Sequence, residues 1–434
     1  MTSALHANET VGQFPPSFYA ATTPPLPAFP ALAGEGTCDV CIVGGGLSGL
    51  SAALHLRRRG YDVVVLDAHR LGWGASGRNG GQIGPGQRVD QIALEAMVGR
   101  EDARALWDAG LAARQLVLDL VDELGIACDL KRGIIHANHR ARLGAHTRAE
   151  VDLLRTRYGY EAIDWLGRED IGALLGTQAY HNGSFDAQGV HLQPLRYVFG
   201  LARACIAAGV RVHEKSEVLA LERGAKPLVK TPGGSLRAGH VILAGNGYLG
   251  KLDRKVADRV MPINNYIIAT EPLGEDLARS LVANDAAVAD SKFVINYFRL
   301  SGDHRLIFGG RESYGYRFPA DIPAYVRKAM LGVYPQLAGT RIDYGWGGTL
   351  GITMNRMPYF DFLAPNILTI GGYSGQGVAM ATWGGAVAAQ AIAGSAERFD
   401  LMARVPTARI PGGYEARLPL LVLGMAWYSL LDRL

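Results

Sequence analysis

Hydrophobic and polar positions near the start of the chain predict a β-α-β unit. Strand-like runs at 40–43 and 61–66, apolar except for Asp62, are typical of strands buried in a parallel sheet. The segment 47–59 between them predicts a helix, which Gly60 ends. Residues 1–36 hold six of the 20 prolines and predict an extended arm, so regular structure is expected to begin at Asp39.

The rest of the chain alternates between helical and strand-like patterns. Amphipathic leucine spacing predicts one helix over 91–125, and further helices are expected at 194–208 and 320–337. Short strands are expected at 210–212, 217–221 and 240–244. Residues 262–316 alternate apolar and polar positions, including a strand-like run at 293–298, which is typical of an antiparallel sheet with one solvated or ligand-facing side.

The amino-acid composition excludes several classes of protein. Hydrophobic residues make up 48% of the 434 residues, so the chain can bury enough apolar surface to fold. The net charge of +4 is too small to favour a nucleic-acid partner. Glycine is the unusual residue, at 56 of 434, roughly twice its ordinary share of about 7%.

The four cysteines are too few for a disulfide scaffold, and the first residues lack the pattern of a secretory signal, so we expect a cytoplasmic protein. Cys38 and Cys41 form a C-x-x-C. Because they lie three apart on a strand, they are expected to point to opposite faces and to be structural.

Two apolar segments resemble membrane spans. Residues 362–396 carry no charge, but the glycine-rich turn inside them favours a strand, a loop and a helix. Residues 418–431 are too short to span a bilayer and predict a docking helix in the tail, for which membrane contact is the less favoured alternative.

A phosphate-binding fingerprint follows the first strand. Gly44, Gly46 and Gly49 form a G-x-G-x-x-G that opens the first helix, and Asp67 ends the next strand. Gly44 permits the turn, Gly46 lets a pyrophosphate approach, and Gly49 lets the helix pack on the strand. Asp67 accepts hydrogen bonds from a ribose diol, which disfavours NADP.

Two further glycine clusters favour FAD over NAD. They lie at 74–82 and 371–377, and the second precedes an apolar helix whose positive N-terminus suits a negatively charged ligand group. Three clusters in distant segments suit a long, buried cofactor. The predicted fold class is therefore α/β, with a Rossmann-like FAD-binding domain and an antiparallel-sheet substrate domain.

The chain resembles the D-amino-acid-oxidase-like family of FAD enzymes, which includes glycine and sarcosine oxidases, and is most similar to its γ-glutamylputrescine oxidase branch. The resemblance rests on the three clusters and on the motifs at 244–249 and 307–310, and it extends to the arm at 18–21 and the tail at 411–434. It implies a discontinuous FAD domain (37–90, 190–261 and 345–400), a substrate domain (91–189 and 262–344) and a tail (401–434).

The resemblance also implies where the cofactor contacts lie. Val218 would lie against the adenine and Ala244 beside the pyrophosphate, while the second and third clusters would flank the isoalloxazine. The expected FAD contacts are Gly44, Gly46, Leu47, Ser48, Gly49, Asp67, Ala68, Ala75, Ser76, Arg78, Asn79, Gly80, Gly81, Gln82, Val218, Ala244, Gly245, Gly372, Tyr373, Gly375, Gln376 and Gly377.

The chain departs from the family pattern at several positions. Asp67 stands where many members have Glu, and Gln376 stands where His is common. Residues 346–353 contain no cysteine that could tether FAD, so non-covalent binding is expected. Residues 262–269 lack the lysine that assists some oxidases in reacting with oxygen, which leaves the electron acceptor open.

The family reaction moves a hydride from the carbon beside an amine to flavin N5, and the imine hydrolyses to an aldehyde or keto product. O2 is then reduced to H2O2. This chemistry requires positioning rather than a strong base. The candidate substrate-side residues are Tyr266, Tyr297, Arg299, Arg311, Trp346 and Gln376, with Phe298, Arg356 and Tyr373 in the wider set. An arginine among them would pair with a substrate carboxylate.

Two other functions stay open. One is a membrane-associated amino-acid dehydrogenase that passes electrons to a quinone, and the other is a flavoprotein with a biosynthetic or non-redox role. A metal site at His136 and His139 is not expected, because side chains three apart on a strand diverge. No serine fits the G-x-S-x-G of a hydrolase.

Overall fold

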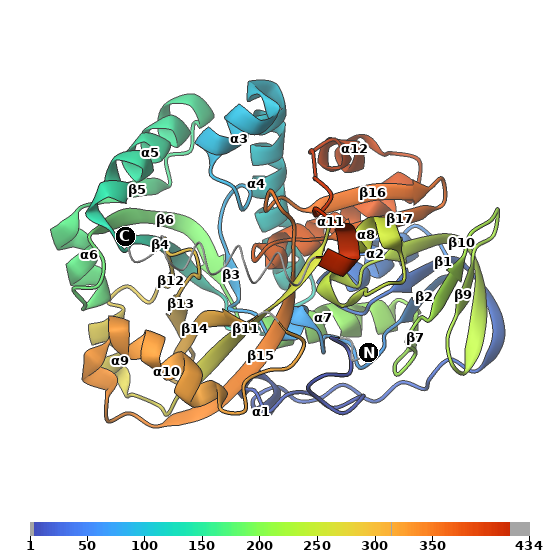
Figure 1. Cartoon of the computed structure of the whole chain (residues 1–434), viewed down its shortest axis with the longest axis horizontal. Helices are drawn as coiled ribbons and strands as arrows, with labels where there is room; N and C mark the ends of the chain where they lie inside the picture. The colour runs from blue at the N-terminus through green and yellow to red at the C-terminus, as the bar shows by residue number, and fades with distance from the viewer. Residues whose placement is uncertain (1–3, 314, 417–434) are drawn as a thin grey trace.

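The computed structural model describes residues 4–313 and 315–416, which are built around two large sheets. Figure 1 shows the first sheet on the right of the view and the second on the left. Within the described residues the first sheet has eight strands and the second has nine. The α/β class and the combination of a Rossmann-like sheet with a largely antiparallel one are confirmed.

The first sheet contains the predicted β-α-β unit. Its main strand order is β16-β17-β10-β1-β2-β7, and the five strands from β17 to β7 run parallel. These strands are β16 (Tyr359–Ala364), β17 (Ile367–Gly371), β10 (Gly234–Leu243), β1 (Gly34–Val43), β2 (Val63–Leu66) and β7 (Arg211–His213). Two short strands, β9 (Leu228–Lys230) and β8 (Ala220–Glu222), extend antiparallel from β10.

Helices bury one face of this sheet. They are α2 (Leu47–Arg57), α4 (Arg100–Glu123), α7 (Pro194–Ala207) and α11 (Gly377–Ile392). The arm takes part in the same core, because its short helix α1 (Phe18–Ala21) buries Phe18 and Tyr19 there. The arm is therefore anchored in the interior rather than only laid over the surface.

The second sheet has the order β15-β11-β14-β13-β12-β4-β6-β3, with β5 paired to β6. Its strands are β15 (Ile342–Ile352), β11 (Met261–Thr270), β14 (Leu306–Ser313), β13 (Tyr297–Leu300), β12 (Ala287–Asp290), β4 (Lys131–Asn138), β6 (Asn182–His191), β3 (Gln82–Ile83) and β5 (Ile163–Leu166). All pairs are antiparallel except β12 with β4. This confirms the prediction of a largely antiparallel sheet.

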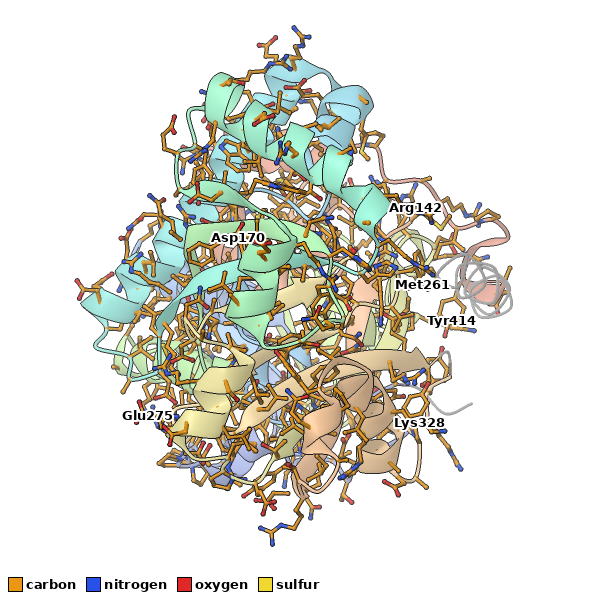
Figure 2. The ribbon with its side chains drawn as sticks, turned by 90° about the vertical axis from the view of Figure 1, so that its left-hand side faces the viewer. Arg142, Asp170, Met261, Glu275, Lys328 and Tyr414 are labelled. Carbon is orange, nitrogen blue, oxygen red and sulfur yellow. The ribbon has the colours of Figure 1, made fainter. Side chains whose placement is uncertain are left out.

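The outer face of the second sheet is covered by α6 (Arg168–Leu175), α9 (Glu275–Leu281) and α10 (Ile322–Val333). Figure 2 shows this side, with Asp170, Glu275 and Lys328 marking the three helices. The remaining helices are α3 (Gln91–Val98), α5 (Gly144–Tyr158), α8 (Arg254–Ala257), α12 (Glu397–Ala403) and the 3-10 turns η1 (Ala75–Gly77), η2 (Ala141–Leu143), η3 (Asn246–Tyr248) and η4 (Pro335–Leu337).

Several element boundaries differ from prediction. The expected helix over 91–125 is two helices, because Gly99 adopts φ 82° and ψ 164°, a conformation that a helix cannot contain. The first strand begins at Gly34 rather than Asp39, and the strand expected over 293–298 begins only at Tyr297. The leucine spacing identified the apolar helix face but carried no information about the break.

The prediction that Cys38 and Cys41 point to opposite faces is wrong. Both side chains are buried in the same apolar cluster, on the face of β1 that carries Val43. The N–H groups of Asp39 and Val40 both donate to the carbonyl of Asp62, at 3.0 and 3.1 Å. This bulge-like pairing with the residue before β2 interrupts the regular alternation of faces, so positions three apart lie on one face. Both cysteines are free thiols.

The uncharged segment 362–396 folds as β16, β17 and α11, as expected. Across the described residues, no helix combines the length and the hydrophobicity that crossing a membrane requires. The apolar segment 418–431 lies outside the described residues. The domain boundaries stay predictions, and β15 continues across the expected boundary at residue 345.

A substitution in α11 tests how closely it packs on α2. A Cβ added at Gly385 would lie 2.3 Å from the Ser48 carbonyl oxygen and 2.6 Å from the Ala52 nitrogen. We expect Gly385→Ala to lower the unfolding free energy by about 1–3 kcal/mol, because rigid backbone atoms must move. Thermal or urea denaturation measures this change.

Gly172→Ala is the matched control, since a Cβ at this position in α6 meets no atom within 4 Å. Alanine's helix propensity should then leave stability unchanged or raise it by up to about 1 kcal/mol. Equal effects of the two substitutions would show that the close contact between α2 and α11 does not limit stability.

Candidate functional site

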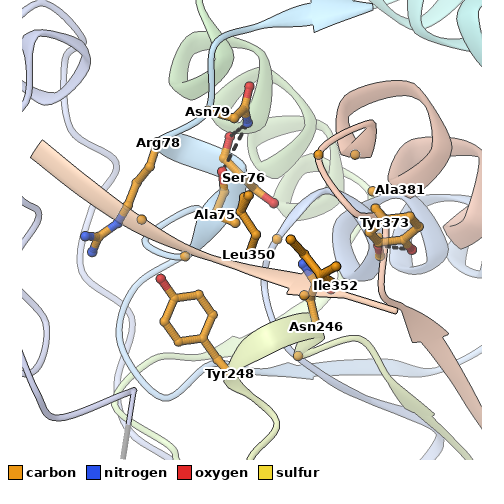
Figure 3. Close-up of a pocket in the computed structure, with 18 of the residues that line it drawn as sticks. Ala75, Ser76, Arg78, Asn79, Asn246, Tyr248, Leu350, Ile352, Tyr373 and Ala381 are labelled. Atoms are coloured by element: carbon orange, nitrogen blue, oxygen red, sulfur yellow. Dashed lines mark hydrogen bonds between the residues drawn. The ribbon is translucent and has the colours of Figure 1, made fainter. Parts of the chain in front are cut away.

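A cavity of about 1220 Å³ is lined by residues of both sheets. Residues of all three glycine clusters line it, together with Val218, Ala244 and Gly245. Pockets for small ligands commonly measure about 300–1,000 Å³, so this cavity suits a larger molecule. Figure 3 shows how η1, β15 and α11 converge on it.

The first glycine cluster forms a tight turn between β1 and α2. Gly44 has φ 114°, and a Cβ there would lie 2.8 Å from the Ala244 carbonyl oxygen. A Cβ at Gly49 would lie 1.9 Å from the Gly44 oxygen, so Gly49 lets α2 pack on the strand without itself lining the cavity. The first N–H groups of α2 have no acceptor within the helix, which makes this end suited to an anion.

Ser76 completes the turn from the second cluster. Its Oγ accepts a hydrogen bond from the Leu47 N–H at 3.0 Å. A Cβ at Gly46 would lie only 2.7 Å from this oxygen. A larger residue at position 46 would therefore displace the Ser76 side chain. The two clusters are thereby joined at the N-terminus of α2.

Asp67 lies at the end of β2 and lines the cavity with Ala68. Its carboxylate accepts backbone hydrogen bonds from Gly45 at 2.8 Å and His69 at 2.7 Å. Burial raises the pKa of Asp67 to about 6, although these hydrogen bonds act in the opposite direction. The carboxylate still has free lone pairs, so it can accept hydrogen bonds from a ribose diol.

Within the second cluster, Asn79 holds the loop, and the Arg78 guanidinium is bonded to neighbouring protein groups. The Asn79 amide donates to the carbonyls of Ala75 and Ser76 (Figure 3). Its side-chain oxygen accepts a hydrogen bond from the Gly81 N–H. The Arg78 guanidinium donates to the Trp73 carbonyl at 2.7 Å and forms an ion pair with Glu9 at 2.8 Å. The Arg78 guanidinium is thus held by protein groups, and because Arg78 also lines the cavity, its expected contact with FAD stays a prediction.

The third cluster lies between β17 and α11. Asn246 holds its start by accepting a hydrogen bond from the Gly372 N–H at 2.8 Å. The Tyr373 hydroxyl shares a hydrogen bond of 2.7 Å with Ser48 Oγ, which ties this cluster to the first. Gln376 donates to the Pro85 carbonyl at 3.3 Å. Gly372 supports the loop but does not line the cavity.

The inner face of the second sheet covers the opposite side of the cavity. The Tyr297 hydroxyl donates to the Asn265 side-chain oxygen, and its ring lies against Gly80 and Gly309, where an added Cβ would collide with it. Tyr297 and Gln376 are the substrate-side candidates that line the cavity. Tyr297 is therefore fixed by contacts on three sides.

The other four candidates are not brought to the cavity. Tyr266 lies on the outer face of β11, because side chains along a strand alternate between the two faces of the sheet. Its hydroxyl shares a hydrogen bond with the Ser313 hydroxyl. Arg299 donates to the Gly80 carbonyl at 2.8 Å, and Trp346 donates to the Arg78 carbonyl at 2.9 Å. The Arg311 guanidinium lies 5.8 Å from the centre of the Tyr325 ring. These side chains support the walls, so we do not propose them as substrate contacts.

Several charged or titratable cavity residues were missed among the candidates, including Arg88, His136 and Glu312. Arg356, from the wider set, lines the cavity too. His136 is solvent-accessible but lines the cavity, and desolvation there together with the nearby charge of Arg88 lowers its pKa to about 4, so it is neutral near pH 7. Arg88 follows the second cluster by only a few residues, which was a usable signal. Glu312 is paired with Asn265 next to a register shift between β11 and β14, which the sequence does not indicate.

The residues present fit FAD. One elongated cavity joins a dinucleotide-type turn at Gly44 to a region, near Tyr297 and Gln376, enclosed by the second sheet. The Cβ positions of Gly44 and Gly46 are closed by neighbouring atoms, so bare backbone lines the turn where phosphates would lie. The N-termini of α2 and α11 both reach the same cavity.

Comparison with known proteins agrees with this geometry. Residues 39–391 match the DAO family model, described as FAD dependent oxidoreductase. The chain is 40% identical over 418 residues to the probable oxidoreductase OrdL of Rhizobium meliloti (strain 1021), covering 96% of this chain and 97% of that protein. It is 39% identical to the gamma-glutamylputrescine oxidoreductase of Escherichia coli (strain K12) over 419 residues, covering 96% and 98%.

Solved structures share the fold. Glycine oxidase from Geobacillus kaustophilus superposes with a TM-score of 0.69 at 20% identity, over 86% of this chain and 96% of that one. L-proline dehydrogenase from P. horikoshii gives a TM-score of 0.66 at 18% identity, over 83% and 94%. The match to the family model and the two relatives similar over nearly their full length show that the chain belongs to the DAO family of FAD-dependent oxidoreductases and is an enzyme.

Proposed function

We propose that this protein oxidises the C–N bond of an amine of the γ-glutamylputrescine type. The observation that carries the proposal is the single cavity in which three glycine clusters face the inner side of the antiparallel sheet. The relative that is 39% identical is a gamma-glutamylputrescine oxidoreductase and covers nearly the whole chain. The product would be an imine, which water hydrolyses to an aldehyde.

The chain would hold FAD without a covalent bond. In the proposed arrangement the backbone of Gly44–Gly49, with Ala244 and Gly245, surrounds the pyrophosphate, Asp67 binds the ribose, and Val218 lies against the adenine. Ala75–Gln82 and Tyr373–Gly377 lie beside the isoalloxazine. None of the cavity-lining residues within 4–313 and 315–416 is a cysteine, which supports non-covalent binding.

FAD, when bound, supplies the acceptor for the hydride that leaves the carbon beside the amine nitrogen. The chain's own contribution is positioning and the exclusion of water. Tyr297, oriented by Asn265 and Gly80, and Gln376, anchored on Pro85, would confine the substrate at this end. Neither side chain needs to remove a proton from carbon.

The simplest test is spectroscopic. The purified protein should show the absorbance of oxidised flavin, and acid precipitation should release all of it because no covalent bond holds it. Anaerobic addition of γ-glutamylputrescine should bleach that absorbance. A flavin-loaded protein that no amine, N-methyl amino acid or D-amino acid bleaches would contradict the proposed function and favour a non-redox role for FAD.

Reoxidation distinguishes the two electron acceptors. We expect the reduced enzyme to reoxidise in air with stoichiometric H2O2. Slow reoxidation by oxygen together with fast reoxidation by a soluble quinone would identify a dehydrogenase instead.

Asp67→Asn tests the ribose contact. The substitution keeps the side-chain shape but removes the charge, and its amide N–H₂ faces a backbone donor at Gly45 or His69. We expect FAD affinity to fall by roughly 10- to 100-fold, the effect of losing hydrogen bonds to a charged group. Fluorescence titration of the apoprotein with FAD measures it.

Asp67→Glu should restore most of this affinity, because it returns the carboxylate. Asp62→Asn serves as a control, since Asp62 is paired with Arg211 at the surface and does not line the cavity. A normal FAD affinity in Asp67→Asn would contradict the assigned contact.

Tyr297→Phe tests the cavity wall. The change removes the hydrogen bond to Asn265 while keeping the ring between Gly80 and Gly309. We expect flavin reduction to slow by about tenfold, because a loosened wall positions substrate less well. Stopped-flow absorbance gives the rate, and an unchanged rate at equal FAD content would remove Tyr297 from the substrate site.

A further inference from the structure

One part of the cavity wall carries three charged side chains for which the described part of the chain offers no hydrogen-bond or ion-pair partner. Arg88 comes from the loop after β3, Glu312 from β14, and Arg356 from the turn after β15. The three line the same cavity, Arg356 acts electrostatically on Arg88 and Glu312, and Arg88 and Glu312 act on each other, so they form one cluster. His136 lies close enough for the charge of Arg88 to lower its pKa, and it is neutral near pH 7.

None of the three side chains makes a hydrogen bond or a direct ion pair with any residue in the described part of the chain. The Arg356 guanidinium rests on the Phe293 ring, 4.6 Å from its centre. All three are only partly accessible, and all three line the cavity. Most other charged side chains near the cavity are engaged, as Arg78 is with Glu9 and Asp290 is with Asn296.

This arrangement is costly without a ligand. Burial lowers the pKa of Arg88 to about 10, helped by repulsion from Arg356, and burial raises the pKa of Glu312 to about 7. Buried charges are ordinarily paired, because desolvation is otherwise uncompensated. Two guanidinium groups and one carboxylate are the complement of a ligand end with a carboxylate and an ammonium group.

The cluster adjoins the region where oxidation is proposed. Glu312 pairs with Asn265 in the sheet register, and Asn265 holds the Tyr297 hydroxyl. Glu312 also acts electrostatically on Tyr297. A ligand bound to the cluster would therefore extend along the inner face of the second sheet toward Tyr297.

We propose that Arg88, Arg356 and Glu312 form a head-group site for the α-amino-acid end of the substrate, with the arginines binding its carboxylate and Glu312 its ammonium. This inference rests on the proposed function and narrows it to amines that carry a zwitterionic amino-acid group at the end away from the oxidised carbon. Amines without that group lack the contacts that fill the cluster.

The test compares two substrates on the FAD-loaded enzyme. γ-Glutamylputrescine carries the head group, whereas putrescine has the same reacting amine without it. For Arg88→Gln, Arg356→Gln and Glu312→Gln we expect kcat/KM with γ-glutamylputrescine to fall by roughly 10- to 100-fold, mostly through KM, because each removes a charged hydrogen bond. The kcat/KM with putrescine should change by less than about threefold.

Two further variants serve as controls. Arg317→Gln removes an exposed arginine close in sequence to Glu312 and outside the cavity, and it should match the wild type with both substrates. Arg88→Lys keeps the charge but loses the bidentate hydrogen-bond donor, so we expect an intermediate loss of kcat/KM with γ-glutamylputrescine. Equal losses with both substrates, or no loss with γ-glutamylputrescine, would overturn the head-group site.

A binding measurement separates this inference from the proposed reaction. N5-ethyl-L-glutamine has the amino-acid head but no terminal amine, so it should bind without turnover and shift the flavin absorbance. N-butylacetamide, which lacks the head, should not. Loss of the shift in Arg88→Gln and Glu312→Gln supports the site even if no amine reduces the flavin. An unaltered shift in those variants, or no shift in the wild type, refutes it even if γ-glutamylputrescine is oxidised.

Discussion

Close backbone approach at a few glycines is the constraint on which the rest of the structure depends. Gly49 brings α2 against the turn that follows β1, and Gly385 brings α11 against α2, at distances that a methyl group would not permit. Because both helices sit so close, their N-termini reach the same cavity. The favourable electrostatics at one end of the cavity thus follow from the absence of side chains.

The walls of this cavity are held by residues that do not face it. Arg299 and Trp346 fix the second cluster by donating to the carbonyls of Gly80 and Arg78. The arm adds the ion pair between Glu9 and Arg78, and it accepts a hydrogen bond from His69 at the Leu5 carbonyl. Side chains that look catalytic by type, an arginine or a tryptophan near the flavin loop, serve here to keep the loop in shape.

The two faces of the second sheet have different surroundings. Its outer face packs apolar residues such as Phe298 and Tyr266 against α10, and its inner face presents polar and charged groups to the cavity. The alternation of strand side chains makes this division unavoidable. The result is a rigid wall in which Asn265, Tyr297 and Glu312 lie close together, so that binding of a substrate head group and positioning of its amine can share one surface.

The sequence alone determined the β-α-β unit, the glycine clusters and the expectation of FAD, because these depend on local spacing and on residues whose backbone freedom is distinctive. It also indicated that the alternating segment 262–316 forms a sheet. It did not determine which faces of those strands met the cavity, since Tyr266 and Tyr297 look equivalent in a one-dimensional pattern. The bulge that puts Cys38 and Cys41 on one face, the break at Gly99, and the meeting of Arg88, Glu312 and Arg356 were decided by tertiary structure. The first two depend on local backbone geometry and strand pairing, which a hydrophobic pattern does not encode. The third depends on contacts between segments far apart in the chain, which leave no periodic pattern in the sequence.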